Sequence, residues 1–283
     1  MNEELKTMHL FAGAGGGILA DLILGHRPIV AVEWDKYACE VLRARVADGW
    51  FDGMSVWEGD VRLFDPSEYQ GRVDCIHAGF PCTDISTAGD QRGVDQDTRS
   101  GLYREVLRIA DVLQPGYLFL ENVANIVSGN NGKWLRTVVG DLAQRGYDCV
   151  WRCISASEVG ANHIRDRWWL LAYPNGNSKS DESINEEIGL VAYSNGTFKQ
   201  RRSISKRVQE KRANIGISNW WKTESDVDRV ADGVASRTHR LKALGNGQVP
   251  LQCATAFKIL WEEHNAIKTA SRKGGSDVKG ITS

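Results

Sequence analysis

The sequence predicts an α/β fold with one mostly parallel, doubly wound sheet, and three observations lead to this prediction. Short apolar runs alternate with helical patterns as far as about residue 173. A glycine cluster at 13–17 separates the first predicted strand from the first helix. The length of 283 residues suffices to bury one α/β core and allows a second small lobe. Because alternating strands and helices are joined by crossover connections, they favour a parallel sheet covered by helices.

The elements follow one another in a repeated order. The strand TMHLF (7–11) precedes the glycine cluster and a helix that ends at Gly25. The strand PIVAVEW (28–34) precedes the helix DKYACEVLRARVA (35–47), which Asp35 can cap. The other strand candidates are MSVW (54–57), VDCIHA (73–78), YLFLEN (117–122), DCVWRCIS (148–155) and WWLLAY (168–173). Further helices are expected near 100–113, 132–145 and 250–264.

An insertion interrupts this pattern at 174–237, where Asn, Gly, Ser and charged residues dominate. LLAYPNGN (170–177) and LVAYSNGT (190–197) resemble each other, and both contain the Asn-Gly pair that favours tight turns. We therefore expect a main domain of residues 1–173 plus 238–266, an inserted region at 174–237, and a flexible tail at 267–283.

Composition argues against several classes of protein. The chain is 42% hydrophobic and 25% charged, and no apolar run approaches the roughly 18 residues that span a bilayer. The amino terminus does not resemble a signal peptide, so we expect a cytoplasmic protein. Six scattered cysteines without a C-x-x-C pair indicate neither a disulfide framework nor a metal site. With a net charge of −1, a nucleic-acid site needs a local basic patch, and KQRRSISKRVQEKR (199–212) is one.

Three segments carry candidate chemistry at the carboxyl ends of predicted strands, where doubly wound sheets bind ligands. LFAGAGGG (10–17) can bring backbone amides close to a ligand, with Glu33 placed for ribose hydroxyls. HAGFPCTDIS (77–86) sets Cys82 in a loop behind a proline, where a thiol is better placed to react than to pack. In YLFLENV (117–123), burial can raise the pKa of Glu121 and let it act as an acid. Taken singly, the three segments also fit an ordinary turn, an inert cysteine and an exposed strand end.

Together and in this order, the segments resemble the cytosine-5 DNA methyltransferase family. The matching segments are FAGAGG (11–16), EWDKYA (33–38), GD (59–60), GFPCTDIS (79–86), ENV (121–123), HIRDRWWLLA (163–172) and RLKALGNGQVP (240–250). The resemblance implies a Rossmann-like methyltransferase sheet with a small target-recognition insertion, as in compact bacterial or phage enzymes. It also implies methyl transfer from S-adenosylmethionine to C5 of cytosine in a specific double-stranded DNA sequence.

The resemblance assigns roles to individual residues. Cys82 would add to C6 of a flipped cytosine, and Glu121 would hold a proton at the N3 and N4 edge of the base. Arg165 would lie near the base O2, supported by Arg167. The implied cofactor residues are Phe11, Gly13 and Gly15 in the cradle, Glu33 at the ribose, Trp34 and Asp60 at the adenine, and Pro81, Asn246 and Val249 at the methionine end. The implied DNA contacts are Ser86 after the nucleophile and Arg201, Arg202, Lys206 and Arg207 in the insertion. No metal is implied.

Two departures from the family pattern and several alternatives remain open. His163 stands where the family usually has Gln, and ASRTHRLKA (235–243) is abbreviated before the Gly-Asn motif, after an insertion that is itself short. The basic stretch also fits a solvated loop. Alternative functions are a tRNA-like RNA cytosine-5 methyltransferase, a catalytically silent DNA-binding relative and a small-molecule methyltransferase. We expect a monomer that binds double-stranded DNA, with a cognate restriction endonuclease as a candidate partner and no membrane contact.

Overall fold

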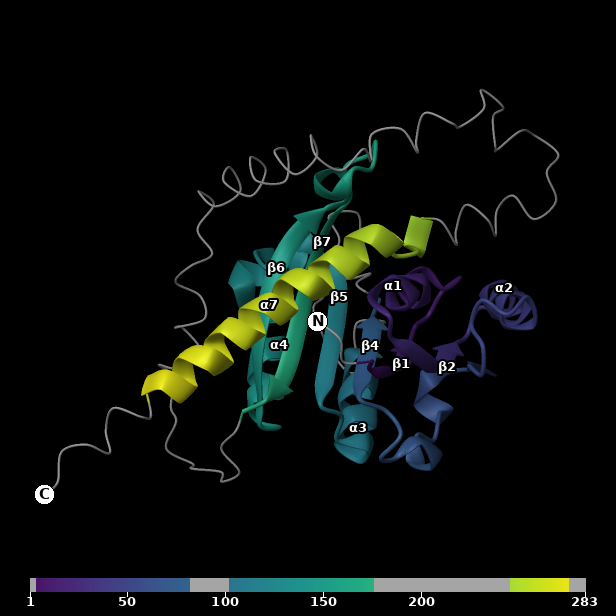
Figure 1. The fold of residues 1–283 in the computed structure, drawn as a ribbon, viewed down its shortest axis with the longest axis horizontal. Coiled ribbons are helices and arrows are strands. Elements are labelled where there is room, and N and C mark those ends of the chain that lie inside the picture. Colours follow the sequence, from purple (N-terminus) through teal and green to yellow (C-terminus); the bar gives the residue numbers. More distant parts are fainter. Residues whose placement is uncertain (1–3, 82–101, 176–244, 275–283) are drawn as a thin grey trace, which may run out of the picture.

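The computed structural model describes residues 4–81, 102–175 and 245–274 (Figure 1). In this part of the chain, seven strands form one sheet in the order β3-β2-β1-β4-β5-β7-β6. The pairs from β3 to β5 are parallel, whereas β7 runs antiparallel to both of its neighbours, β5 and β6. The predicted mostly parallel, doubly wound sheet is therefore confirmed.

The helices and strands lie where the sequence pattern predicts them, with most ends shifted by a few residues. The strands are β1 Lys6–Leu10, β2 Arg27–Glu33, β3 Ser55–Glu58, β4 Cys75–Gly79, β5 Tyr117–Val123, β6 Tyr147–Ser155 and β7 Asp166–Pro174. The α-helices are α1 Gly16–Leu24, α2 Lys36–Ala47, α3 Tyr103–Leu113, α4 Lys133–Ala143 and α7 Pro250–Gly274. Short 3-10 turns stand at Val61–Leu63, Ser67–Tyr69, Ala124–Ile126, Gly129–Gly132 and Ala156–Val159.

Two of the predicted helix ends have the expected local chemistry. The Asp35 side chain accepts a hydrogen bond of 3.1 Å from the Ala38 N–H and so caps the start of α2. Gly25 ends α1 in the left-handed region, at φ 76°, where its N–H bonds back to carbonyls of the last turn. Both signals can be found in the sequence because each depends on one residue type at one position.

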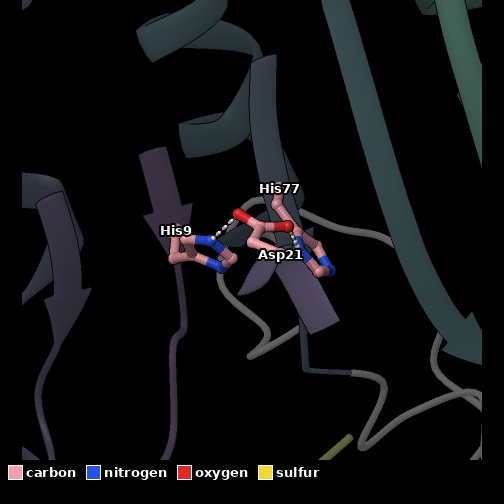
Figure 2. A group of neighbouring side chains, drawn as sticks. All are labelled: His9, Asp21 and His77. Carbon is pink, nitrogen blue, oxygen red and sulfur yellow. Dashed lines mark hydrogen bonds and ion pairs between the residues drawn. The ribbon is translucent and has the colours of Figure 1, made fainter. Parts of the chain in front are cut away.

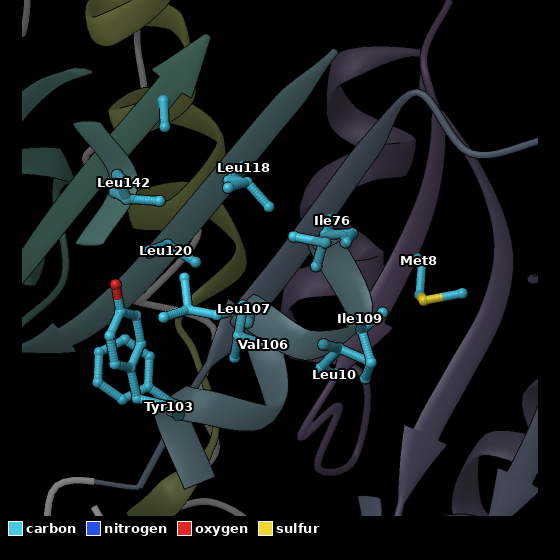
Figure 3. Packing of buried hydrophobic residues seen from close by; sticks show 14 of the residues in the cluster. Met8, Leu10, Ile76, Tyr103, Val106, Leu107, Ile109, Leu118, Leu120 and Leu142 are labelled. Atoms are coloured by element: carbon cyan, nitrogen blue, oxygen red, sulfur yellow. The ribbon is translucent and has the colours of Figure 1, made fainter. Parts of the chain in front are cut away.

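Helices cover both faces of the sheet, and the side chains of each strand alternate between the two. Met8 and Leu10 of β1 face a large apolar cluster that includes Tyr103 and Leu107 of α3 (Figure 3). The other face of the sheet packs against α1 and α7, and its core includes Phe257 of α7. This two-sided burial explains why the strands read as nearly continuous apolar runs.

The last helix, α7, crosses the sheet and ends later than predicted. It packs against α1, β6 and β7 (Figure 1). It continues to Gly274, so residues 267–274, which we expected to open a flexible tail, are helical. Most of the predicted insertion, including the second Asn-Gly segment, lies outside the described residues. No helix in the described ranges is both long and apolar enough to cross a membrane.

Candidate active site

The three candidate segments meet at one edge of the sheet. The glycine loop follows β1, Pro81 follows β4 after one residue, and Glu121 lies near the end of β5. These strands are adjacent in the order β1-β4-β5, and Gly79 pairs in register with Glu121. The chain reverses its winding direction between β1 and β4, which makes this edge the topological switch point where open α/β sheets bind ligands.

Glu33 ties the glycine loop to the end of β2. One carboxylate oxygen, Oε2, accepts a 2.7 Å bond from the Gly13 N–H. The other, Oε1, accepts bonds of 3.0 and 2.8 Å from the N–H groups of Trp34 and Asp35. Since a carboxylate offers about four acceptor positions, three backbone bonds leave room for a hydroxyl donor. Phe11 stands at φ 56° in this loop, a left-handed conformation uncommon for a residue with a side chain.

Gly13, Trp34 and Asp60 are the residues in or beside this loop that were expected to contact a nucleoside. A Cβ atom added to Gly13 would meet no atom of the described residues within 4 Å. The Trp34 side chain is 71% exposed, and such an indole face is suited to stacking against an aromatic base. Arg62 donates to both carboxylate oxygens of Asp60 at 3.0 Å, and the expected contact of Asp60 with adenine stays a prediction. The bonds from Arg62 lower the pKa of Asp60, which stays an acceptor.

Glu121 is buried with a cation at its edge. Its residue surface is 9% exposed, so the alternative of an exposed strand end is wrong. Burial raises the pKa of Glu121, and Arg167, Gln248 and Arg165 oppose that rise. The Arg167 Nε–H donates to Oε1 at 2.8 Å, and the Gln248 amide donates to Oε2 at 3.5 Å. The carboxyl is therefore fixed in direction while its burial favours the protonated form.

Asn122 fixes the start of the loop that leads to Cys82. Its buried amide donates a 3.1 Å bond to the Phe80 carbonyl, and its own oxygen accepts from the Val123 N–H at 2.8 Å. The backbone immediately before Pro81 is thus held against the end of β5. Sequence reasoning missed this role, although the position of Asn122 beside Glu121 was a signal for it.

Arg165 joins the carboxyl-terminal segment to the site. Its guanidinium donates to the carbonyls of Gly245 at 2.9 Å and Gly247 at 2.8 Å. Its Nε is buried and has no hydrogen-bond partner among the described residues, and burial lowers the pKa of the guanidinium. Arg167 pairs with Glu121, and its expected role as a support for Arg165 stays a prediction. Asn246, which stands between the two bonded glycines, is exposed.

Several of the predicted site residues lie outside the described part of the chain. They are Cys82, Ser86, Arg201, Arg202, Lys206 and Arg207. Pro81 is the last residue described before the first internal gap, and Val249, immediately before α7, is half-buried and accepts the Cys253 N–H at 3.0 Å. The structure therefore brings together Gly13, Glu33 and Trp34 at one strand end and Glu121, Arg165 and Arg167 at another.

A buried polar cluster that the sequence did not predict lies behind the site. Asp21 of α1 accepts bonds from the Thr7 hydroxyl at 2.5 Å and from His9 Nε2 at 2.7 Å, and His77 Nδ1 lies 4.0 Å from its other oxygen (Figure 2). Burial opposes ionisation of Asp21, but His9 and His26 together hold the pKa of its carboxyl well below the usual range. Burial lowers the pKa of His77 to about 3, so this ring is neutral. The cluster links α1 to β1 and β4, the two strands at the switch point.

The fold and the site define an α/β protein that carries a glycine loop and a buried carboxyl at the switch point of its sheet. The model of the C-5 cytosine-specific DNA methylase family matches residues 5–275, and the chain belongs to this family.

Similar proteins include type II methyltransferases. M.CviJI of Paramecium bursaria Chlorella virus IL3A is 36% identical over 60% of this chain and 43% of its own length. M.HhaI of Haemophilus parahaemolyticus is 31% identical over 60% of this chain and 50% of its own length. The chain thus spans about half the length of these curated relatives. A crystal structure described as a DNA modification methyltransferase from an E. coli prophage covers 65% of this chain and 51% of that chain, with a TM-score of 0.50 and 24% identity, and shows the shared fold.

Proposed function

We propose that this protein transfers a methyl group from S-adenosylmethionine to C5 of cytosine in a specific double-stranded DNA sequence. The family match over residues 5–275 and the similarity to type II methyltransferases support this activity. The reaction would proceed on a base flipped out of the duplex, because C6 and C5 are inaccessible to a side chain within the stack. Cys82 would form a covalent bond to C6 in the course of it.

The observation that carries the proposal is the state of Glu121. This carboxyl is buried at a strand end, has a raised pKa and is aimed by Arg167. It stands on the strand next to the one that leads to Pro81 and Cys82, and Asn122 holds the two strand ends together. A thiol and a proton-bearing carboxyl on neighbouring strand ends are what addition to a cytosine ring requires.

The proposed steps balance in atoms and charge. The Cys82 thiolate adds to C6, and the displaced electron pair is stabilised at N3 by the proton of Glu121, which leaves an enamine with a nucleophilic C5. C5 then bonds to the methyl carbon while the bond from that carbon to the sulfonium sulfur breaks, and the electron pair of the broken bond stays on sulfur in the product S-adenosylhomocysteine. C5 loses its hydrogen as a proton to water, the thiolate leaves C6 to restore the ring, and the proton at N3 returns to Glu121. The bound carboxylate also accepts a hydrogen bond from the N4 amino group, which selects cytosine.

The residues of the first strand end would hold the cofactor. Phe11, Gly13 and Gly15 form the cradle, and Glu33 keeps an acceptor position for a ribose hydroxyl. When bound there, S-adenosylmethionine supplies an electrophilic methyl group. The other proposed cofactor contacts are Trp34, Asp60, Pro81, Asn246 and Val249.

The proposed DNA contacts rest on the sequence. Residues 174–237 would form the target-recognition region beside a catalytic domain of residues 1–173 and 238–266, with Arg201, Arg202, Lys206 and Arg207 on phosphates and Ser86 near the flipped base. Such phosphate contacts would offset the few kcal/mol that base flipping costs.

We also propose that the protein acts as a monomer in the cytoplasm without a metal, with a restriction endonuclease of the same sequence specificity as a candidate partner.

Bisulfite sequencing of plasmid DNA from a host that expresses the chain tests substrate and atom together. We expect protected cytosines confined to one short sequence, and none in a host that carries the Cys82→Ala variant. A parallel assay with labelled donor compares duplex DNA with tRNA. Label in tRNA alone, or an unprotected plasmid together with an unlabelled duplex, would overturn the proposal.

A further inference from the structure

Gln248 occupies a gap that three glycines keep open between the carboxyl-terminal segment and the sheet. A Cβ atom on Gly16 would lie 2.2 Å from the Gln248 backbone oxygen. On Gly17 it would lie 2.4 Å from the side-chain Oε1, and on Gly79 it would lie 2.9 Å from Nε2. Real Cβ atoms do not approach other heavy atoms this closely, so each glycine leaves room for a different part of Gln248.

The two ends of the Gln248 amide face different chemistry. On one side, Nε2 lies 3.5 Å from Glu121 Oε2, an acceptor. On the other, Oε1 accepts from the Cys253 thiol at 3.8 Å. Burial raises the pKa of Cys253 well above its usual value, so this thiol keeps its proton and can donate it. The His77 ring shares this corner, because a Cβ on Gly17 would also lie 2.7 Å from its Cε1.

These neighbours determine which way the amide points. With Glu121 ionised, an amide turned by 180° would direct Oε1 at the carboxylate, a pairing of acceptor with acceptor, and would leave its N–H groups only the weakly accepting sulfur of Cys253. The observed direction satisfies both ends. The N–H end of Gln248 is thereby committed to Glu121.

We propose that Gln248 is a positioning residue for Glu121: its amide N–H aims the second carboxyl oxygen at the flipped base and stabilises that oxygen as an acceptor. This proposal rests on the proposed function, because it takes Glu121 as the group that contacts cytosine. Gln248 would also make the active carboxyl sensitive to the carboxyl-terminal segment, since Arg165 holds the glycines at 245 and 247 on the same stretch.

The effect of Gln248 on the pKa of Glu121 can be separated from the effects of the other charged and titratable groups around this carboxyl. Arg167 of β7 bonds to Oε1, and Arg165, which immediately precedes β7, acts at longer range. From α7, the Cys253 thiol contributes no charge while it stays protonated. Burial raises the pKa of Glu121, and the hydrogen bond from Gln248 is one of the effects that lower it again. Loss of that bond alone leaves both arginines in place, so it should raise the pKa of Glu121 further.

Two variants of Gln248 test this. Gln248→Met keeps the length of the side chain and removes the donor, and Gln248→Glu keeps the shape and adds a like charge. Because the reaction uses protonated Glu121, activity declines as pH rises through its pKa. We expect the alkaline limb of kcat/KM for duplex methylation to move up by about half a pH unit or more in the Met variant, the equivalent of one weak charge-assisted hydrogen bond. The Glu variant should move it further.

A purely structural role would give a different result, namely a rate reduced by the same factor at every pH, and that result would overturn the inference. Gln144→Met is the matched control, because Gln144 lies at the end of α4, away from the site, and should leave the profile unchanged. Urea unfolding of each variant establishes that it is folded at the pH of assay.

A second measurement does not depend on activity. The infrared carbonyl band of protonated Glu121, assigned by its loss in Glu121→Gln, can be titrated in the free protein. We expect its midpoint to rise in Gln248→Met and in Gln248→Glu. An unchanged midpoint in both would refute the positioning role even if the protein methylates DNA. A shifted midpoint in a protein that methylates no cytosine would refute the proposed function and leave the contact between Gln248 and Glu121 standing.

Discussion

At the scale of single residues, Glu121 is held between two opposing effects. Burial at the end of β5 disfavours its charged form, while Arg167 and Gln248 direct hydrogen bonds at that form. A carboxyl in this balance can accept a hydrogen bond from an amino group or carry a proton to a ring nitrogen without large movement. The proposed mechanism asks it to do both at adjacent positions of one base.

Glu121→Gln separates these two abilities. Glutamine keeps the shape and can still hydrogen-bond, but it cannot deliver a proton, so we expect methylation to slow by about 10²- to 10³-fold. DNA binding should stay within a factor of a few, as measured by fluorescence anisotropy. Glu105→Gln removes a carboxylate paired with Arg108 on α3 and serves as the control. A Glu121→Gln enzyme with more than half of the original rate would contradict the assigned role.

Motif residues were predictable at this scale, and their supporting partners were not. Glu33 and Glu121 could be assigned because a charged residue at the end of an apolar strand is easily recognised in the amino-acid sequence. Asn122 and Gln248 act through contacts with Phe80 and Glu121 across 42 and 127 positions of the sequence, respectively. Such contacts depend on the strand order, which local patterns do not specify.

At the scale of elements, close packing between the carboxyl-terminal segment and α1 completes the site. The Gln248 backbone rests on Gly16 at a distance that excludes any side chain there. This approach accounts for a glycine run longer than a turn requires, because Gly16 and Gly17 provide space rather than unusual backbone angles.

Gly16→Ala tests this contact. The added methyl would meet backbone, which cannot rotate away, so we expect the free energy of unfolding to fall by about 1 to 3 kcal/mol. Gly140→Ala is the matched control, since a Cβ there, in the middle of α4, would meet no atom of the described part of the chain within 4 Å. It should be neutral or stabilise by up to about 1 kcal/mol. Equal urea midpoints for the two variants would show that the contact between Gly16 and Gln248 is loose in solution.

The buried His77 predicts a pH dependence of stability. Its pKa is lowered from 6.5 to about 3 in the folded state, so the unfolded chain binds more protons between these values. Its contribution to stability is therefore complete above about pH 6.5 and declines as pH falls, by roughly 1.4 kcal/mol per pH unit. His264 adds a decline of the same sign, because burial lowers its pKa as well.

His77→Leu removes this proton site. Between pH 6 and pH 4 we expect the stability of His77→Leu, from urea unfolding, to decline less steeply than that of the unsubstituted protein. Leu171→Val, a buried change on the same face of the sheet, should lower stability by a similar amount at every pH. If His77→Leu gave a curve parallel to that of the unsubstituted protein, His77 would not be held neutral.

Most of the fold could be predicted from the sequence because its strands are buried on both faces and its helices have clear ends, such as Asp35 and Gly25. The length of α7 could not. Its last turns, beyond residue 266, are polar and resemble a disordered tail, although they continue a helix that is anchored on the sheet by Phe257 and Leu260. The antiparallel direction of β7 could not be predicted either, because an apolar run has the same sequence pattern in a parallel and in an antiparallel strand.

At the scale of the whole molecule, the net charge of −1 requires that DNA affinity come from a local region. We expect the variant Arg201→Ala/Arg207→Ala to bind duplex DNA more weakly for all sequences alike. In a plot of the logarithm of the binding constant against the logarithm of the salt concentration, the slope for this variant should be shallower by about one for each phosphate that is no longer neutralised. Lys258→Ala, on the exposed side of α7, is the control. An unchanged salt slope in the double variant would place the phosphate-binding surface elsewhere.

The most direct test of the central claim is covalent trapping on a DNA duplex with 5-fluorocytosine at the target position, in the presence of S-adenosylmethionine. Fluorine cannot leave C5 as a proton, so the proposed reaction stops with sulfur bonded to C6. We predict a protein–DNA adduct that survives denaturation, formed by the unsubstituted protein and absent from Cys82→Ala, which still binds the duplex. An adduct or turnover with Cys82→Ala, or efficient methylation of ordinary cytosine without any trapping by the unsubstituted protein, would contradict the account.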